Sequence, residues 1–253
     1  MHPVLFTIGR FHIYTYGVFV ALSILVGSSL FVREGKRSGL DPSALGDIVI
    51  YAVVFGVIAA RMFYVVLNLD EFRLSFMDIL FIWKGGFVFR GAILGGVFGA
   101  YVGSRRKGIS FVTTVDTAAP FIPLSHAIGR LGCFSAGCCY GKVCHLSWAI
   151  TVKNPMSLSP LGVSLHPVQL YSSFMNTLIF LFLYFFFKKK KKFPGELILE
   201  YLALYGVGRF VVEFYRGDPR PMVFKWLSFN QLFAGICAIF SFALIIALRS
   251  RRS

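Results

Sequence analysis

Apolar residues along this chain gather in long runs separated by short polar segments. A helix needs roughly 20 apolar residues to cross the hydrocarbon core of a membrane. Suitable runs lie near residues 15–32, 48–67, 86–103, 111–132, 169–187, 197–214 and 227–248. The pattern therefore predicts an all-α, multi-pass membrane protein with seven transmembrane helices, and we expect residues 1–253 to form a single integral membrane domain.

Two of these runs contain residues that affect how a helix packs or bends. The third run is short and rich in glycine, which favours close contact with another helix over contact with lipid. Pro120 and Pro123 fall inside the fourth run. Proline removes a backbone donor and clashes with the preceding turn, so we expect a kink there.

Composition supports a membrane protein. The chain is 57% hydrophobic and only 15% charged, whereas soluble domains are about a quarter charged. Its net charge of +15 would suggest nucleic-acid binding in a soluble protein. Here the basic residues lie mostly in short loops between apolar runs, where they determine topology, so we expect no nucleic-acid partner.

The distribution of basic residues predicts the orientation in the membrane. With the N-terminus outside, the cytoplasmic segments hold 14 Lys and Arg residues and the outer segments hold 8. The cytoplasmic set is Arg33, Lys36, Arg37, Arg105, Arg106, Lys107, Lys188 to Lys192, Arg249, Arg251 and Arg252; the outer set is Arg10, Arg73, Lys84, Lys142, Lys153, Arg216, Arg220 and Lys225. The positive-inside rule then puts the N-terminus outside and the C-terminus in the cytoplasm. The lysine run after the fifth span is typical of a stop-transfer segment that contacts anionic lipid.

Four arginines lie within the predicted spans, namely Arg61, Arg90, Arg130 and Arg209. In the predicted topology all of them fall in the outer half of the bilayer. Cations at one depth repel each other in a low dielectric unless an anion joins them. A lipid phosphate is a suitable anion because guanidinium binds its oxygens in a bidentate manner. The alternative is that the arginines pair with carboxylates, of which only Glu213 lies deep on that side, or extend to the headgroups.

The sixth predicted span has a polar stripe. Tyr201, Tyr205, Arg209 and Glu213 are spaced four residues apart and therefore share one helix face. Arg209 and Glu213 can form an ion pair that orients the guanidinium and leaves some of its donors free. We expect Tyr205 to use its hydroxyl beside the arginine and Tyr201 to be ordinary packing.

Histidines and cysteines surround Arg130. His126 lies one helical turn before it and could accept a proton near neutral pH, or only bond a neighbouring carbonyl. His166, before Pro167, is equally consistent with a structural turn or cap. The cysteines at 133, 138, 139 and 144 lack the paired C-x2-C spacing of structural zinc, so no metal is predicted, and a disulfide or free thiols both remain open.

Three motifs connect the chain to a known family. GRLG at 129–132 followed by Phe134, HPVQLY at 166–171 and YGVGRFVVEFYR at 205–216 resemble the prolipoprotein diacylglyceryl transferases. The resemblance covers most of the chain. It implies a transferase, without a cofactor, that moves the diacylglyceryl group of phosphatidylglycerol onto a cysteine thiol of a prolipoprotein signal peptide. A thioether forms and glycerol phosphate is released.

The resemblance also implies roles for individual residues. Arg130 and Arg209 would hold the phosphate, Glu213 would orient Arg209, and Tyr16 and Tyr205 would line the pocket. Arg90 and Arg61, from their depth in the membrane, are added as lipid ligands. Such a site must bind phosphate, stabilise the charge of the leaving group and accept a thiol proton.

The chain departs from the family pattern at three places. Arg90 stands where the third-span motif has a histidine, and Cys133 replaces the asparagine after G-R-x-G. The N-x-E that follows in the family is AGCC here, at 136–139. Arginine cannot deprotonate a thiol, so His126 becomes the candidate base. The alternatives are a lipid-binding protein of the same fold that has lost catalysis, or a transferase with a different acceptor. A transporter or receptor is disfavoured because the charges cluster on one side, although Asp116 lies in the inner half.

The topology can be tested with reporter fusions and cysteine accessibility. We expect a reporter at Lys190 to be active in the cytoplasm and residues 134–168 to be labelled from outside. A reporter at Lys190 that is active only in the periplasm would reverse the orientation. The arginines would then lie toward the inner leaflet, and the outer-leaflet site would be wrong.

Overall fold

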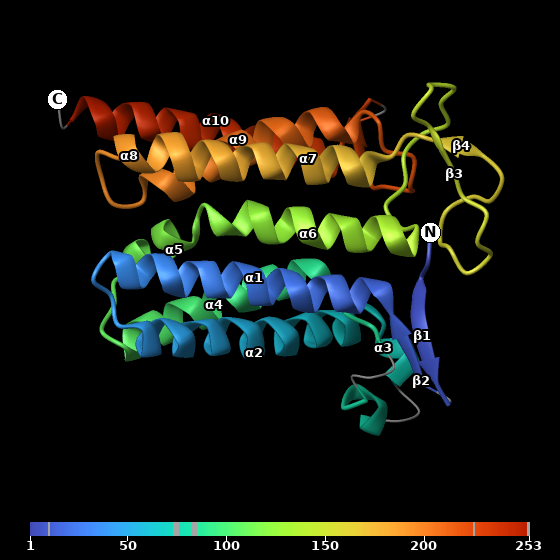
Figure 1. Ribbon diagram of the computed structural model, residues 1–253, viewed down its shortest axis with the longest axis horizontal. Coiled ribbons are helices and arrows are strands. Elements are labelled where there is room, and N and C mark those ends of the chain that lie inside the picture. The colour runs from blue at the N-terminus through green and yellow to red at the C-terminus, as the bar shows by residue number, and fades with distance from the viewer. Residues whose placement is uncertain (10, 73–75, 82–84, 225, 252–253) are drawn as a thin grey trace. The chain divides into compact units, whose positions relative to one another are not determined.

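A computed structural model describes the chain except for residues 10, 73–75, 82–84, 225 and 252–253 (Figure 1). Five residues of the topology count therefore lie outside the described residues: Arg10, Arg73, Lys84, Lys225 and Arg252. The positions of the remaining basic residues are described.

Helices dominate the structure, as the apolar pattern predicts. They are α1 (Thr15–Arg37), α2 (Pro42–Leu67), α3 (Leu69–Phe72), α4 (Phe89–Arg106), α5 (Phe111–Ala118), α6 (Phe121–Ala136), α7 (Val168–Leu181), α8 (Lys188–Lys190), α9 (Glu196–Glu213) and α10 (Phe229–Ser250). A 3-10 turn covers Phe76–Ile79, and a π-helical segment, Phe182–Phe187, joins α7 to α8. Every predicted apolar run is largely helical.

Four helical segments are long and apolar enough to cross a membrane, namely Thr15–Arg37, Pro42–Leu67, Val168–Lys190 and Phe229–Ser250. This finding covers the described residues. It confirms the prediction of a helical, multi-pass membrane protein. The exact number of spans and the sidedness of the termini stay predictions.

The described residues include three small antiparallel sheets that were not predicted from the sequence. They pair β1 (Val4–Ile8) with β2 (Phe11–Tyr14), β3 (Ile150–Thr151) with β4 (Ser164–Leu165), and β5 (Met222–Phe224) with β6 (Leu227–Ser228). Two-stranded sheets this short have no stability of their own.

The chain divides into two compact units. One contains Phe31–Val115, and the other contains Met1–Leu30 together with Asp116–Ser253.

In the Phe31–Val115 unit, α4 packs against α2 through a face of glycines. Gly91, Gly95, Gly99 and Gly103 are all buried and repeat every fourth residue. A Cβ atom on Gly95 would lie only 2.3 Å from the carbonyl oxygen of Phe55 on α2. The two backbones therefore touch, which confirms the predicted role of the glycine-rich run.

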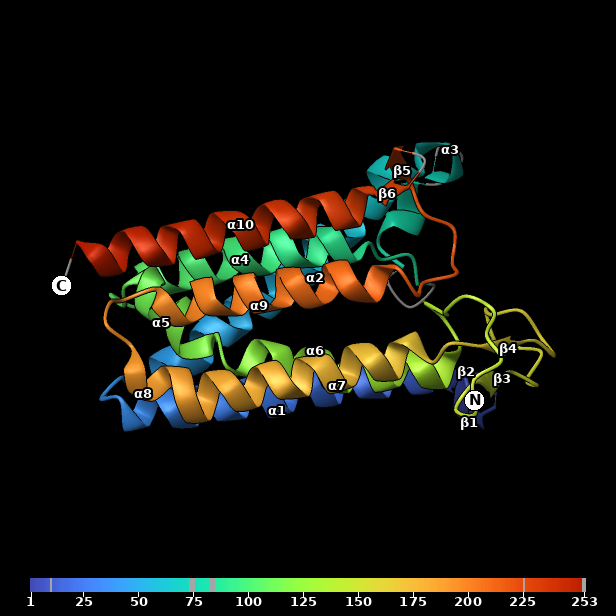
Figure 2. The ribbon, with the colours of Figure 1, turned by 90° about the horizontal axis from the view of Figure 1, so that it is seen from above.

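The unit that contains Asp116–Ser253 packs α6 against α7, and α9 against both α7 and α10 (Figures 1 and 2). Its buried core is formed by Ala119, Ile179, Leu183, Leu197 and Tyr201. Tyr201 is 8% exposed and belongs to this core. The prediction that Tyr201 is a packing residue is confirmed.

Proline interrupts the fourth predicted span as expected. The helix ends at Ala118 and begins again at Phe121. Asp116, in the last turn before this break, is buried and accepts a hydrogen bond at Oδ1 from the Ile198 N–H at 3.1 Å. Its Oδ2 lies 2.6 Å from Lys191 Nζ. Asp116 therefore anchors the start of α9, which explains its burial without a transport path.

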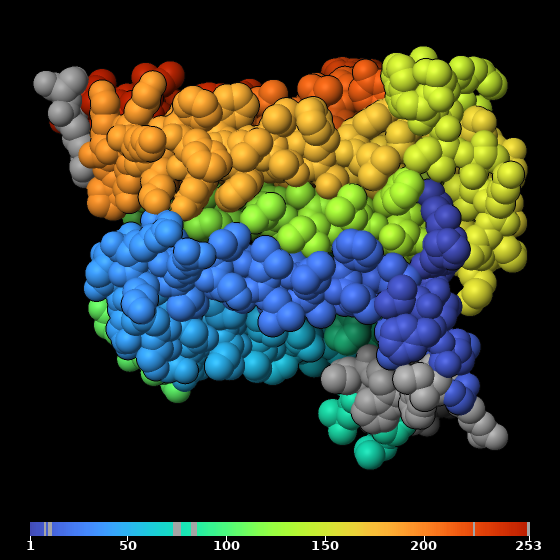
Figure 3. Space-filling view, in the orientation of Figure 1, coloured from blue at the N-terminus to red at the C-terminus, as the bar shows by residue number. Residues whose placement is uncertain are grey.

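The loop between α6 and α7, residues 137–167, covers the opposite end of this unit and stands out beyond the helix ends (Figure 3). Asn154 Nδ2 donates to the Met1 carbonyl at 3.2 Å. The Lys142 N–H donates to Tyr215 O at 2.8 Å, and the Gly217 N–H donates to Tyr140 O at 3.1 Å. These bonds bring the N-terminus, the loop and the end of α9 together.

The glycine face predicts a clear difference between two alanine substitutions on α4. Gly95→Ala should lower stability by about 1–3 kcal/mol, because the new methyl group forces two backbones apart. Gly96→Ala is the matched control, since its nearest neighbour, Ala52 O, lies at an ordinary 3.7 Å. Thermal unfolding in detergent measures both. Equal melting temperatures for the two variants would contradict the close contact.

Candidate active site

Arg209 and Glu213 form the ion pair that their spacing predicts. Arg209 Nη2 lies 2.6 Å from Glu213 Oε2, and the two side chains are only 14% and 3% exposed. Arg209 Nη1 is buried and has no hydrogen-bond partner among the described residues. A buried donor without a partner is costly. This nitrogen is therefore available to an anion.

Glu213 is held as a carboxylate by further donors. Its Oε1 accepts hydrogen bonds from Arg220 Nη1 at 3.1 Å, Ser228 Oγ at 3.1 Å and Asn230 Nδ2 at 3.2 Å. All of these bonds favour the ionised form. Glu213 consequently orients Arg209 and is poorly suited to accept a proton. Arg220 lies in the segment after α9, which the sequence predicts as an outer loop, whereas Ser228 and Asn230 lie at the start of the seventh predicted run.

Arg130 uses its guanidinium to bond His126. The two residues lie one turn apart on α6, and Arg130 Nε donates to His126 Nε2 at 3.2 Å. Among the described residues, the hydrogen-bond partner of His126 is thus the arginine. The imidazole ring also lies 5.3 Å from the ring of Tyr205 on α9, measured between centroids. Contacts between α6 and α9 therefore join His126, Arg130 and Tyr205.

The two arginines expected to hold a phosphate lie close enough for their charges to interact. Arg130 and Arg209 interact with each other through their charges, and Arg209 also interacts with Tyr205. Tyr16, at the start of α1, interacts with Arg130 and with Cys133. The structure therefore gathers Tyr16, Arg130, Tyr205 and Arg209, as the resemblance implies.

A second charge cluster lies beside the end of α9 and was missed in the sequence. Arg216 binds Asp218 with a two-pronged contact, from Nε to Oδ1 at 2.9 Å and from Nη2 to Oδ2 at 2.8 Å. Arg220 Nη2 donates to the same Oδ2 at 2.9 Å. Burial alone would raise the pKa of Asp218, but hydrogen bonds and charge from both arginines lower it below its ordinary value. The alternating pattern R-x-D-x-R was the available signal.

The described part of this site carries excess positive charge. It holds four guanidinium groups, on Arg130, Arg209, Arg216 and Arg220, and two carboxylates, on Glu213 and Asp218. A phosphate diester carries one negative charge, so it would offset part of this excess and accept hydrogen bonds from the donors that remain.

Arg61 and Arg90 belong to the other compact unit. Arg61 is buried, and its guanidinium donates to the backbone carbonyls of Asp78, Ile79, Gly85 and Gly86 at 2.6–3.1 Å. These bonds use four of its five N–H groups and account for the buried charge without a lipid. Arg90 lies exposed in the first turn of α4. Roles for Arg61 and Arg90 in lipid binding stay predictions.

His166, near the end of the loop, belongs to an aromatic cluster. Its Nδ1 lies 3.2 Å from the hydroxyl of Tyr171, and its ring lies 5.3 Å from that of Tyr215. Trp148 Nε1 donates to the same Tyr171 hydroxyl at 2.8 Å. These contacts favour the structural interpretation of His166.

Comparison with known proteins agrees with this geometry. The family model described as prolipoprotein diacylglyceryl transferase matches residues 3–247. A phosphatidylglycerol–prolipoprotein diacylglyceryl transferase of Clostridium tetani is 35% identical over 96% of this chain and 97% of its own length. A protein of the same name from Clostridioides difficile is 34% identical over 86% of this chain and 84% of its own length. A protein of the same name from Synechocystis sp. is 32% identical over 85% of this chain and 79% of its own length.

Proposed function

Because this chain belongs to the prolipoprotein diacylglyceryl transferase family, we propose that it transfers the diacylglyceryl group of phosphatidylglycerol to a prolipoprotein signal-peptide cysteine. The observation that carries the proposal is the buried Arg209 Nη1, which has no hydrogen-bond partner among the described residues, on a guanidinium whose charge interacts with that of Arg130. The names of the relatives do not favour the alternative of a non-catalytic lipid-binding protein.

The lipid phosphate is the group that these arginines recognise. Arg209 Nη1 and the Nη groups of Arg130 donate to its oxygens, while Glu213 keeps Arg209 in position. The acceptor thiolate attacks the glycerol carbon that carries the phosphate. The new S–C bond forms as the C–O bond breaks, and the electron pair leaves with glycerol phosphate. Negative charge on the leaving group rises during this step, and fixed guanidinium groups stabilise it.

The thiol proton needs an acceptor, and His126 takes that role in this proposal. In the structure its Nε2 accepts the Arg130 Nε–H. When a phosphate draws the Arg130 donors toward itself, the Nε2 lone pair becomes available to the thiol. The base would then be ready only when the lipid is bound. Arg90 and Cys133, which replace the family's histidine and asparagine, take no part in this proton transfer.

We further propose that the chain is a single membrane domain of seven spans in a bacterial inner membrane, with the site toward the outer leaflet. The N-terminus would lie outside and the C-terminus in the cytoplasm. One arrangement within the Asp116–Ser253 unit supports this orientation. Lys188 to Lys192 lie beyond the C-terminal end of α7. The site lies at the C-terminal ends of α6 and α9, next to the loop that precedes α7. The lysine run and the site therefore lie at opposite ends of α7.

Lysine should not replace either phosphate-binding arginine. Arg130→Lys and Arg209→Lys keep the charge but lose the planar fork, so we expect turnover to fall by about 100-fold or more. The assay measures the mass of a lipobox peptide incubated with phosphatidylglycerol. Arg105→Lys, at an exposed position near the end of α4, is the matched control and should be fully active. Full activity in Arg130→Lys would argue against direct phosphate binding.

Two substitutions of His126 separate a base from a residue that only positions Arg130. His126→Ala removes both functions, whereas His126→Gln keeps an oxygen that can accept the Arg130 N–H. If His126 is the base, both variants should lose turnover by about 100-fold or more while phosphatidylglycerol still binds. Retained activity in His126→Gln would leave only the positioning role.

A further inference from the structure

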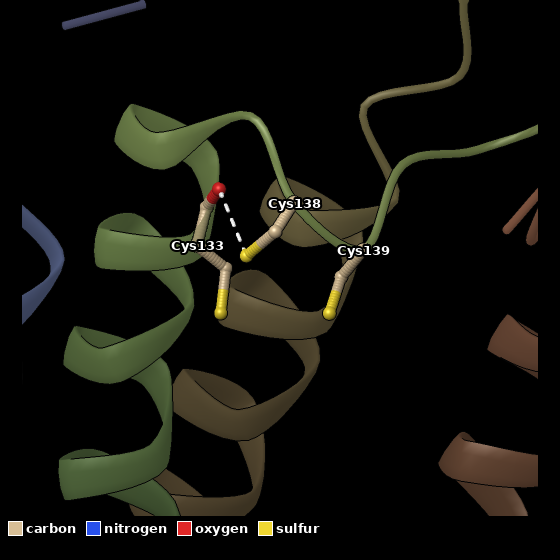
Figure 4. A group of neighbouring side chains, drawn as sticks. All are labelled: Cys133, Cys138 and Cys139. Atoms are coloured by element: carbon tan, nitrogen blue, oxygen red, sulfur yellow. Dashed lines mark hydrogen bonds between the residues drawn. The ribbon is translucent and has the colours of Figure 1, made fainter. Parts of the chain in front are cut away.

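Three cysteine sulfurs converge at the end of α6. Cys133 lies in the last turn of the helix, and Cys138 and Cys139 follow its end at Gly137. The three Sγ atoms all lie within 4.8 Å of one another (Figure 4). All are partly buried free thiols, whereas Cys144 is buried outside this group and Cys237 lies in α10.

The backbone holds the sulfurs in this arrangement. The chain reverses at Gly137, which has a φ of 70°, and the Cys138 N–H donates to Cys133 O at 3.1 Å. Cys139 has a φ of 60° and is the one non-glycine residue with positive φ in the part of the chain that the structure describes. A side chain in this region is strained and persists only where its surroundings enforce it. Gln169 Nε2 contributes by donating to Cys138 O at 2.8 Å.

We propose that Cys133, Cys138 and Cys139 form a three-thiolate site for a soft metal ion, with Zn²⁺ as the ion that fits best. Tetrahedral zinc has Zn–S bonds of about 2.3 Å, which puts neighbouring sulfurs roughly 3.8 Å apart. The sulfurs need to move by on the order of 1 Å at most to reach this geometry. A disulfide requires a far closer approach, to about 2.05 Å.

The surroundings suit the charge of such a complex. Three thiolates around one Zn²⁺ carry a net charge of −1. Arg216, which is buried and fixed by Asp218, interacts electrostatically with Cys139. A guanidinium beside the sulfurs stabilises an anionic complex. Among the described residues no fourth His, Cys, Asp or Glu joins the group, so the fourth position would be filled by water or by an external ligand.

The spacing of the cysteines in the sequence does not predict this metal site. Neighbouring residues of an extended chain point their side chains in opposite directions, so adjacent cysteines do not suggest a shared ion. The left-handed conformation of Cys139 removes that restriction. The site does not depend on the transferase reaction, although the thiols lie close enough to Tyr16 to interact with it electrostatically.

Metal analysis of the full chain tests the proposal. The protein is purified in detergent with a phosphine reductant, and zinc is measured by mass spectrometry. We expect about one zinc per chain in the wild type and at least a tenfold loss in Cys133→Ser, Cys138→Ser and Cys139→Ser. Cys144→Ser and Cys237→Ser are the matched controls and should keep the metal. Melting curves establish that every variant is folded.

Cobalt supplies an independent readout. After removal of the native ion with a chelator, Co²⁺ should produce a sulfur-to-metal charge-transfer band in the wild type and not in Cys139→Ser. Three results would each overturn the proposal. They are the absence of both zinc and the cobalt band, equal metal content in Cys133→Ser and the wild type, and a disulfide that links two of these cysteines in the protein isolated without reductant.

Discussion

A guanidinium group kept away from water needs a partner for its charge and for each of its N–H donors. The chain meets this demand in different ways. Arg61 donates to backbone carbonyls, and Arg216 forms a bidentate ion pair with the carboxylate of Asp218. Arg209 is only half satisfied, because Glu213 neutralises its charge but Nη1 is left without a partner among the described residues. This incomplete pairing distinguishes a site for a substrate anion from arginines that only maintain the fold.

Local patterns in the sequence predicted the features that depend on local physics. The apolar runs became helices, Pro120 broke one of them, and the four-residue spacing of Arg209 and Glu213 produced their ion pair. Features that depend on distant backbone could not be predicted in this way. The carbonyls around Arg61 come from a loop 17 to 25 residues further along the chain. No side-chain pattern encodes a carbonyl, so a buried arginine with such partners is indistinguishable in sequence from one that awaits a phosphate.

The loop of residues 137–167 links two kinds of chemistry in one unit. Its backbone pairs with the segment after α9, where Arg216 and Asp218 lie, and its first turn carries the three converging thiols. Arg216 interacts with both sets, through Asp218 and through Cys139. The replacement of the family's asparagine by Cys133 is therefore not an isolated change, because Cys138 and Cys139 lie within reach of the same sulfur. The cysteines form a group whose members depend on one another.

The glycine face of α4 also limits how this part of the protein can deform. Packed helices usually slide past each other by small rotamer adjustments of the side chains between them. Gly91, Gly95, Gly99 and Gly103 have no rotamers, and the atoms that they meet on α2 are largely backbone. No layer of flexible side chains separates the two helices. Any motion during a catalytic cycle must therefore move α2 and α4 together, as one rigid body.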